Sequence, residues 1–150
     1  MRSWKSLLQD NSVRRVSTSG KEISDRIDCA RLSFNDSLNE TRSDTGKYKD
    51  LYDTAFQWCF IVLRAEGWRT QSGGHHEAVF SAFRHFLGDP VDDLASFLDE
   101  CRSKRHELHY DWTPTTVSEV EADELETVVK ELELIVLEWL RSHHPEYLKD

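Results

Sequence analysis

Residues 48–67, YKDLYDTAFQWCFIVLRAEG, form the most apolar helical pattern in the chain. A helix that is hydrophobic around nearly its whole circumference is buried against several neighbours. Gly67 suits the position after the last turn, where glycine commonly ends a helix. The stretch therefore predicts a central helix with the other elements packed around it. Its apolar positions are Leu51, Tyr52, Ala55, Phe56, Cys59, Ile61, Val62, Leu63 and Ala65.

The sequence on either side predicts further amphipathic helices and no strands. Apolar residues at three- and four-residue steps favour helices over about 21–41 and 75–87. Asp89-Pro90 predicts the start of a third. A last helix runs to about Ser142 after Pro114, with Thr116 and Glu119 as a predicted capping box. We expect an all-α, up-and-down bundle of four or five helices, with turns at 42–46 and 68–74.

Composition and charge narrow the class of protein. The chain has 150 residues, of which 38% are hydrophobic and 31% charged, which is typical of one globular domain. Its net charge of −9 argues against a broad basic face for nucleic acid, so any such binding must be local. Residues 1–20 are expected to be an extension with a short docking helix at Trp4, Leu7 and Leu8.

The three cysteines predict a reducing compartment. Cys29, Cys59 and Cys101 are far apart, and none belongs to a Cys-x-x-Cys pair. An odd count without framework spacing favours free thiols, so we expect a cytoplasmic protein in which all three pack in the core. We find no signal-peptide pattern and no segment of membrane-spanning length, so we expect no contact with a membrane.

A cluster of cations and imidazoles stands in residues 101–112, CRSKRHELHYDW. Arg102, Arg105 and His109 follow helical spacing and share one face, on which they could bind a phosphate and move a proton near neutral pH. Arg105 falls on the apolar stripe, where a cation needs a partner or a cleft. The alternative is a solvated helix end whose cations complement the helix dipole and are neutralised by nearby carboxylates.

Other histidines and tryptophans admit two interpretations. His75-His76 opens a helix after Gly73-Gly74 and could belong to a substrate or metal site, although such residues more often pack or cap. No carboxylate or cysteine stands at the spacing of a zinc motif, so we predict neither metal nor cofactor. We assign Trp58 and Trp139 to the core, Trp68 and Trp112 to the surface, and His143-His144 to an exposed tail.

Two segments resemble the HEPN family, small helical bundles of prokaryotic toxin–antitoxin and nucleotidyltransferase-linked systems. One is the buried helix that ends at Gly67-Trp68 and is followed by Gly73-Gly74-His75-His76. The other is the segment 101–111, which is similar to the Arg-x-x-Arg-Asn…Tyr-Asp helix end of one branch. With helix order, the resemblance covers roughly residues 21–142. It implies a HEPN-like domain at 21–150.

The resemblance also implies roles for individual residues. Six residues separate Arg102 from His109, which fits the arginine–histidine spacing of HEPN ribonucleases and makes this pair catalytic. Arg105, His106 and Tyr110 would bind phosphate or substrate; His106 stands where the branch commonly has asparagine.

The function that the resemblance implies has two alternatives. The chain is either a metal-independent endoribonuclease toxin or a non-catalytic module that binds RNA or nucleotide and partners a nucleotidyltransferase-type antitoxin. HEPN proteins are usually homodimers in which the motif helices of both subunits line one cleft. A shared cleft would explain the position of Arg105.

Overall fold

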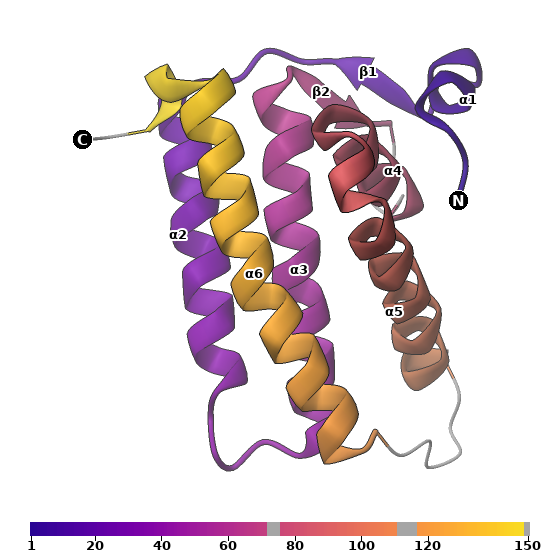
Figure 1. Cartoon of the computed structure of the whole chain (residues 1–150), viewed down its shortest axis with the longest axis vertical. Coiled ribbons are helices and arrows are strands. Elements are labelled where there is room, and N and C mark those ends of the chain that lie inside the picture. The colour runs from indigo at the N-terminus through magenta and orange to yellow at the C-terminus, as the bar shows by residue number, and fades with distance from the viewer. Residues whose placement is uncertain (72–75, 111–116, 149–150) are drawn as a thin grey trace.

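The computed structural model describes residues 1–71, 76–110 and 117–148, and of Tyr110 the backbone alone. Within these residues the chain forms six α-helices, two short 3₁₀ helices and one two-stranded sheet (Figure 1). The predicted helical bundle is confirmed. In chain order the elements are α1 (Trp4–Gln9), β1 (Val13–Arg15), α2 (Gly20–Ser37), α3 (Asp44–Ala65), β2 (Trp68–Thr70), α4 (His76–Leu87), η1 (Asp89–Val91), α5 (Asp92–Tyr110), α6 (Glu119–His143) and η2 (Pro145–Tyr147).

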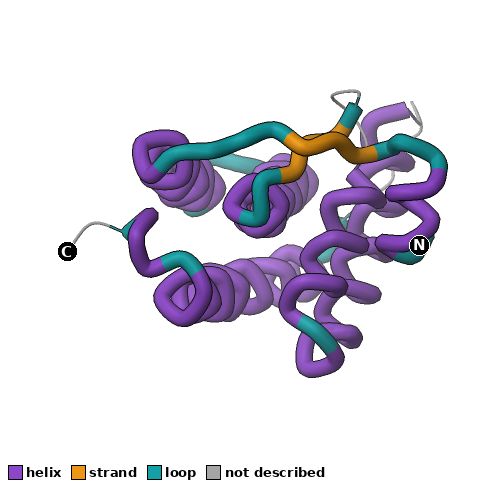
Figure 2. The backbone as a smooth tube through the Cα atoms, turned by 90° about the horizontal axis from the view of Figure 1, so that it is seen from above, coloured by secondary structure: helices purple, strands orange, loops and turns teal. Residues whose placement is uncertain are grey.

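Helix α3 occupies the centre of the bundle, as its apolar pattern predicts. It contacts α2, α4, α5 and α6, and Figure 2 shows these helices around it when the bundle is seen from above. Trp58, Ile61 and Leu63 are fully buried on it, and Gly67 ends it with a φ of 82°. A residue with a side chain is strained at such a positive φ, which is why glycine suits the position.

A buried arginine, Arg64, connects the end of α3 to three other segments. Its side chain is 1% exposed and all five of its N–H donors are used. Nε and Nη2 donate to the two carboxylate oxygens of Glu22 on α2, at 2.9 and 2.8 Å. The remaining bonds go to the backbone carbonyls of Val16, Ser17 and Trp68, at 2.8–2.9 Å. These contacts pair the charge and place the start of α2 beside the end of α3.

The prediction of no strands was wrong, because β1 and β2 pair antiparallel with Val13 opposite Thr70 and Arg15 opposite Trp68. Three-residue strands are too short to show an alternating pattern. Trp68 was also misassigned to the surface: it is half-buried, and its ring lies 5.3 Å from that of Trp4. Residues 1–20 thereby join the single core, with Leu7 of α1 buried as expected of a docking helix.

Several local predictions need correction. Helix α3 begins at Asp44 inside the predicted turn, because the Ser43 side chain caps it by accepting from the Gly46 N–H. The capping box of α6 is formed by Ser118 and Glu121; the predicted box included Thr116, which lies outside the described residues. Cys29 is exposed, whereas Cys59 and Cys101 are buried as predicted.

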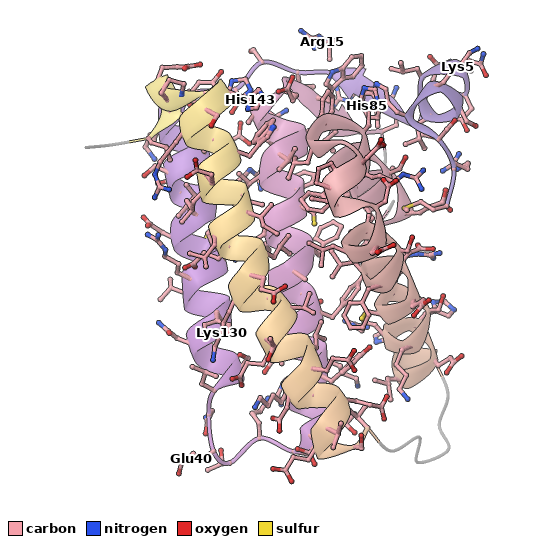
Figure 3. The ribbon with its side chains drawn as sticks, viewed as in Figure 1. Lys5, Arg15, Glu40, His85, Lys130 and His143 are labelled. Carbon is pink, nitrogen blue, oxygen red and sulfur yellow. The ribbon has the colours of Figure 1, made fainter. Side chains whose placement is uncertain are left out.

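Of the two histidines predicted to form an exposed tail, His143 is exposed and His144 is not. The His144 side chain is 18% exposed, and its Nε2 lies 2.8 Å from Glu66 Oε1. This contact holds the tail against the end of α3. In Figure 3 the labelled His143 and Arg15 lie at this end of the bundle, and Glu40 lies at the other. Trp58 and Trp139 are buried, as predicted.

Replacing Glu22 by Gln should destabilise the protein by about 3–5 kcal/mol, because the buried Arg64 charge loses its partner. Arg64 holds the pKa of Glu22 well below its ordinary value of 4.5. The contribution of Glu22 to stability is therefore complete above pH 4.5 and is lost as the pH falls below it. Urea unfolding at pH 7 and pH 3.5 measures this effect. The difference in unfolding free energy between the wild type and E22Q should be smaller at pH 3.5 than at pH 7.

Lys21→Gln is the matched control, since it removes an exposed charge from the adjacent position. It should leave both unfolding curves unchanged. An E22Q variant as stable as the wild type at pH 7 would contradict the importance of this pair.

Candidate functional site

The cations of segment 101–112 lie on α5 and differ in how they are paired. Arg102 donates from Nε to Asp99 Oδ1 at 2.9 Å, within the same helix. Lys104 lies 3.1 Å from Glu121 of α6. Arg105 Nε is 3.9 Å from Asp53 Oδ1 on α3, which is an ion pair too long for a hydrogen bond. Within the described residues, this Arg105 Nε is buried and has no hydrogen-bond partner.

The other residues predicted for the site occupy the last two turns of α5. His106 and His109 are exposed on its surface. Tyr110 is the last residue of the helix, and its side chain lies outside the described part of the chain, as do Asp111 and Trp112. The predicted face is thus present on one helix. Arg105 reaches α3, Arg102 pairs within α5, and both histidines are more exposed than the arginines.

A histidine from another helix, His76, lies near these arginines. It is the first residue of α4, and its Nδ1 is 2.7 Å from the Tyr52 hydroxyl of α3. The Phe56 ring stacks on the imidazole with 4.1 Å between centroids. The next residue, Glu77, accepts hydrogen bonds from the backbone N–H and Nε of Arg2, which anchors the start of α4. His76 is therefore held by packing on both sides.

Electrostatics connects His76 with the arginines of α5. Burial lowers the pKa of His76, and the nearby charges of Arg105 and then Arg102 lower it further. Burial raises the pKa of Asp53, and the positive charge of Arg105 offsets part of this rise. The imidazole is consequently neutral at neutral pH beside two guanidiniums. We call these residues the Arg–His cluster: Tyr52, Asp53, His76, Arg102 and Arg105.

The Arg–His cluster combines the groups that a phosphate site uses. Guanidiniums bind phosphate oxygens through charge-assisted hydrogen bonds, and Arg105 has a buried donor that an anion would satisfy. Burial raises the pKa of the Tyr52 phenol, so its hydroxyl keeps its proton. A Tyr52 hydroxyl that donates to Nδ1 places the imidazole proton of His76 on Nε2. His76 would then offer an uncharged donor.

Sequence reasoning missed two members of this cluster and undervalued a third. Tyr52 was assigned to the apolar core, which describes its ring but not its hydroxyl. Asp53 was not considered, although it interrupts the apolar circumference of its helix and could have been noticed for that reason. His76 was considered with His75 for substrate or metal. His75 lies outside the described residues.

The described part of the chain contains neither a metal-binding group of side chains nor a helix suited to span a membrane. In residues 1–71, 76–110 and 117–148, no three His, Cys, Asp or Glu side chains are grouped to hold a metal ion. None of the described helices combines the length and the apolar character needed to cross a bilayer.

The chain has no match among protein-family models, curated proteins or solved structures.

Replacing Arg105 by Gln should raise the pKa of His76 measurably toward its ordinary value of 6.5, because one neighbouring cation is removed. The pKa should stay below 6.5, since burial is the larger cause. An NMR titration of the imidazole resonances measures the change. Lys104→Gln is the matched control on the same helix and should leave the pKa unchanged. Equal His76 titration curves in R105Q and the wild type would show that Arg105 lies too far from His76 to affect its pKa.

Proposed function

We propose that the chain is a HEPN-like protein that binds RNA phosphates at the Arg–His cluster and cleaves the strand without metal. The observation that carries the binding proposal is the buried, unbonded Nε of Arg105 beside the neutral imidazole of His76. A buried donor without an acceptor is unfavourable, and a phosphate oxygen would satisfy it. The weak contact with Asp53, at 3.9 Å, would yield readily to such an anion.

Cleavage is assigned by resemblance to Arg102 and His109. In this reaction a base takes the proton of the 2′-hydroxyl, whose oxygen then bonds to phosphorus. The bond to the 5′-oxygen breaks, and that oxygen takes a proton from solvent. We assign the base to the exposed imidazole of His109, and the stabilisation of phosphorane charge to Arg102 and Arg105. His106 and Tyr110 are proposed to contact the substrate.

The second candidate is a non-catalytic module that binds RNA or nucleotide and pairs with a nucleotidyltransferase-type partner. The net charge of −9 favours it, because an acidic surface repels long nucleic acid and restricts contact to a short segment. The same cluster would serve both functions. A homodimer with two such clusters at one cleft is part of either proposal. Light scattering of the purified protein tests the dimer directly.

Binding should depend on Arg105 more than on the neighbouring Lys104. A fluorescent single-stranded RNA should bind R105Q about tenfold more weakly than the wild type, because a charge-assisted phosphate contact is lost. The slope of log affinity against log salt should decrease by about 0.7 if one phosphate contact disappears. Lys104→Gln, whose amine pairs with Glu121, should bind nearly as the wild type does. RNA affinity equal in R105Q and wild type would exclude this binding site.

Cleavage should require His109. Wild-type protein with EDTA should convert single-stranded RNA to fragments with 2′,3′-cyclic phosphate ends. His109→Ala should slow this about 10²–10⁴-fold, the usual contribution of a general base, while RNA affinity stays within about threefold. His143→Ala, a histidine of α6, is the control. Undiminished cleavage by H109A refutes the role of His109, and binding without any cleavage by the wild type favours the non-catalytic module.

A further inference from the structure

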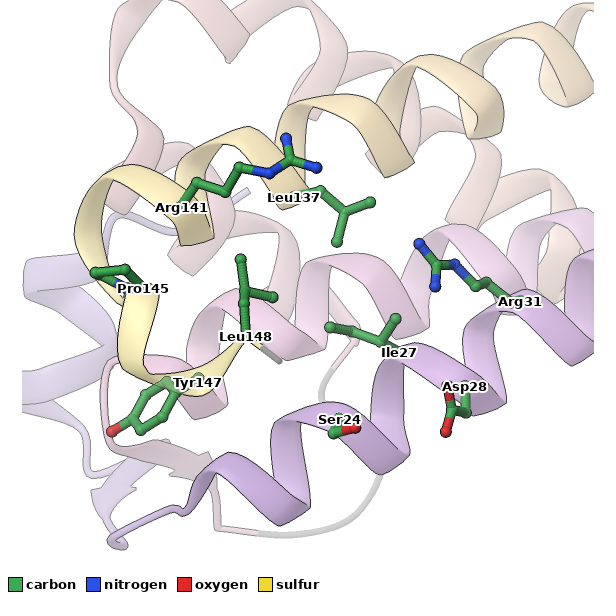
Figure 4. Close-up of a pocket in the computed structure, with 9 residues that line it drawn as sticks. All are labelled: Ser24, Ile27, Asp28, Arg31, Leu137, Arg141, Pro145, Tyr147 and Leu148. Carbon is green, nitrogen blue, oxygen red and sulfur yellow. The ribbon is translucent and has the colours of Figure 1, made fainter. Parts of the chain in front are cut away.

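A recess of about 670 Å³ lies between α2, α6 and η2 (Figure 4). Helices α2 and α6 both pack on α3, and η2 folds back against α2. The recess is therefore bounded by three elements at the end of the bundle where the tail meets α3, away from the C-terminal end of α5 (Figure 1). Its volume is within the range of pockets that hold small molecules.

The inner wall of the recess is apolar. Ile27 of α2 and Leu137 of α6 face it and are 6% and 8% exposed. Tyr147 and Leu148 border it from the segment that follows α6. Figure 4 shows Ile27, Leu137 and Leu148 converging on the same space. A hydrocarbon or aryl group placed there would be removed from water.

Two arginines from opposite walls stand beside this apolar surface. Arg31 comes from α2 and Arg141 from α6, and Figure 4 shows both side chains extending over the recess, near Leu137. Their present ionic contacts are loose: Arg31 Nε is 3.7 Å from Glu133, and Arg141 Nη1 is 3.3 Å from Glu138. Exposed pairs of this kind are weak, so each guanidinium can turn to another anion.

Cations reach the recess from both walls, with carboxylates close to them. Arg31 and Arg141 flank the apolar space, and Glu133 and Glu138 lie within 3.7 Å of their guanidiniums. Asp28 is the one carboxylate among the lining residues, and Figure 4 shows it on the opposite side of α2 from the Arg31 guanidinium. The apolar wall and the two guanidiniums together favour a molecule with one anionic group and one apolar group. A purely anionic or purely apolar molecule would contact only part of the lining.

We infer that this recess binds a small amphipathic monocarboxylate, such as a medium-chain fatty acid. The carboxylate would lie between Arg31 and Arg141 and accept hydrogen bonds from both guanidiniums. The aliphatic chain would pack against Ile27, Leu137 and Leu148. This site is separate from the Arg–His cluster and does not depend on the proposed RNA binding.

The test is an NMR titration of the ¹⁵N-labelled full chain with three probes: octanoate, 1-octanol and acetate. Octanoate should give saturable shifts confined to α2 residues 24–31 and to residues 137–148. Octanol lacks the charge and acetate lacks the chain, so each should bind at least about tenfold more weakly. Arg141→Gln should weaken octanoate binding about tenfold. Lys130→Gln is the matched control, an exposed cation of α6 outside this recess that is labelled in Figure 3.

Three outcomes would overturn the inference. Octanol binding as tightly as octanoate, with R141Q unchanged, would show an apolar recess without selection for anions. Acetate binding as tightly as octanoate would show a surface cation site without an apolar contribution. An absence of saturable shifts with millimolar octanoate would show that the recess does not bind this class of ligand. An unchanged melting temperature of R141Q confirms that the variant is folded.

Discussion

The buried ion pair between Arg64 and Glu22 fixes how the end of α3 meets α2, β2 and the segment before α2. A guanidinium that is 1% exposed must be paired and fully hydrogen-bonded, and here every N–H has an acceptor. Those acceptors belong to the segment before α2, to α2 itself and to β2. One side chain thus specifies how four pieces of backbone meet, whereas the apolar contacts of α3 would tolerate small shifts.

The residues of the Arg–His cluster make none of the Arg64 contacts, but one of their helices, α3, is fixed by those contacts. Its members come from three helices, with Tyr52 on α3, His76 at the start of α4 and the arginines on α5. Helix α3 is fixed at its C-terminal end, and α4 is anchored at its first turn by Arg2. The hydroxyl and the imidazole are therefore held at 2.7 Å by elements that cannot easily move apart. A site built on well-anchored helices loses little order when a ligand binds.

The apolar periodicity of residues 48–67 was sufficient to predict the central helix, and Gly67 was correctly predicted to end it, where it adopts a positive φ. Periodicity could not reveal β1 and β2, because three-residue strands are too short to show alternation; Arg64 donates to the carbonyls of Trp68 in β2 and of Val16 just after β1. The pairing of His76 with Tyr52 was equally hidden, since it joins residues 24 positions apart through tertiary packing. The arginines of the site were predictable from helical spacing, but the sequence did not show that Asp53 and His76 would lie near them.

Glu66, in the turn after α3, contacts residues from both the first and the last segments of the fold. The Glu66 carbonyl accepts from Arg15, 51 residues earlier, and its carboxylate contacts His144, 78 residues later. Closing such long loops is entropically costly, whereas α2 and α3 form a hairpin from nearby sequence. We therefore expect folding to start in the α2–α3 hairpin and to finish where the first and last segments meet. Loosening either terminus would then weaken the hold on the other, so that fraying would spread between residues distant in sequence.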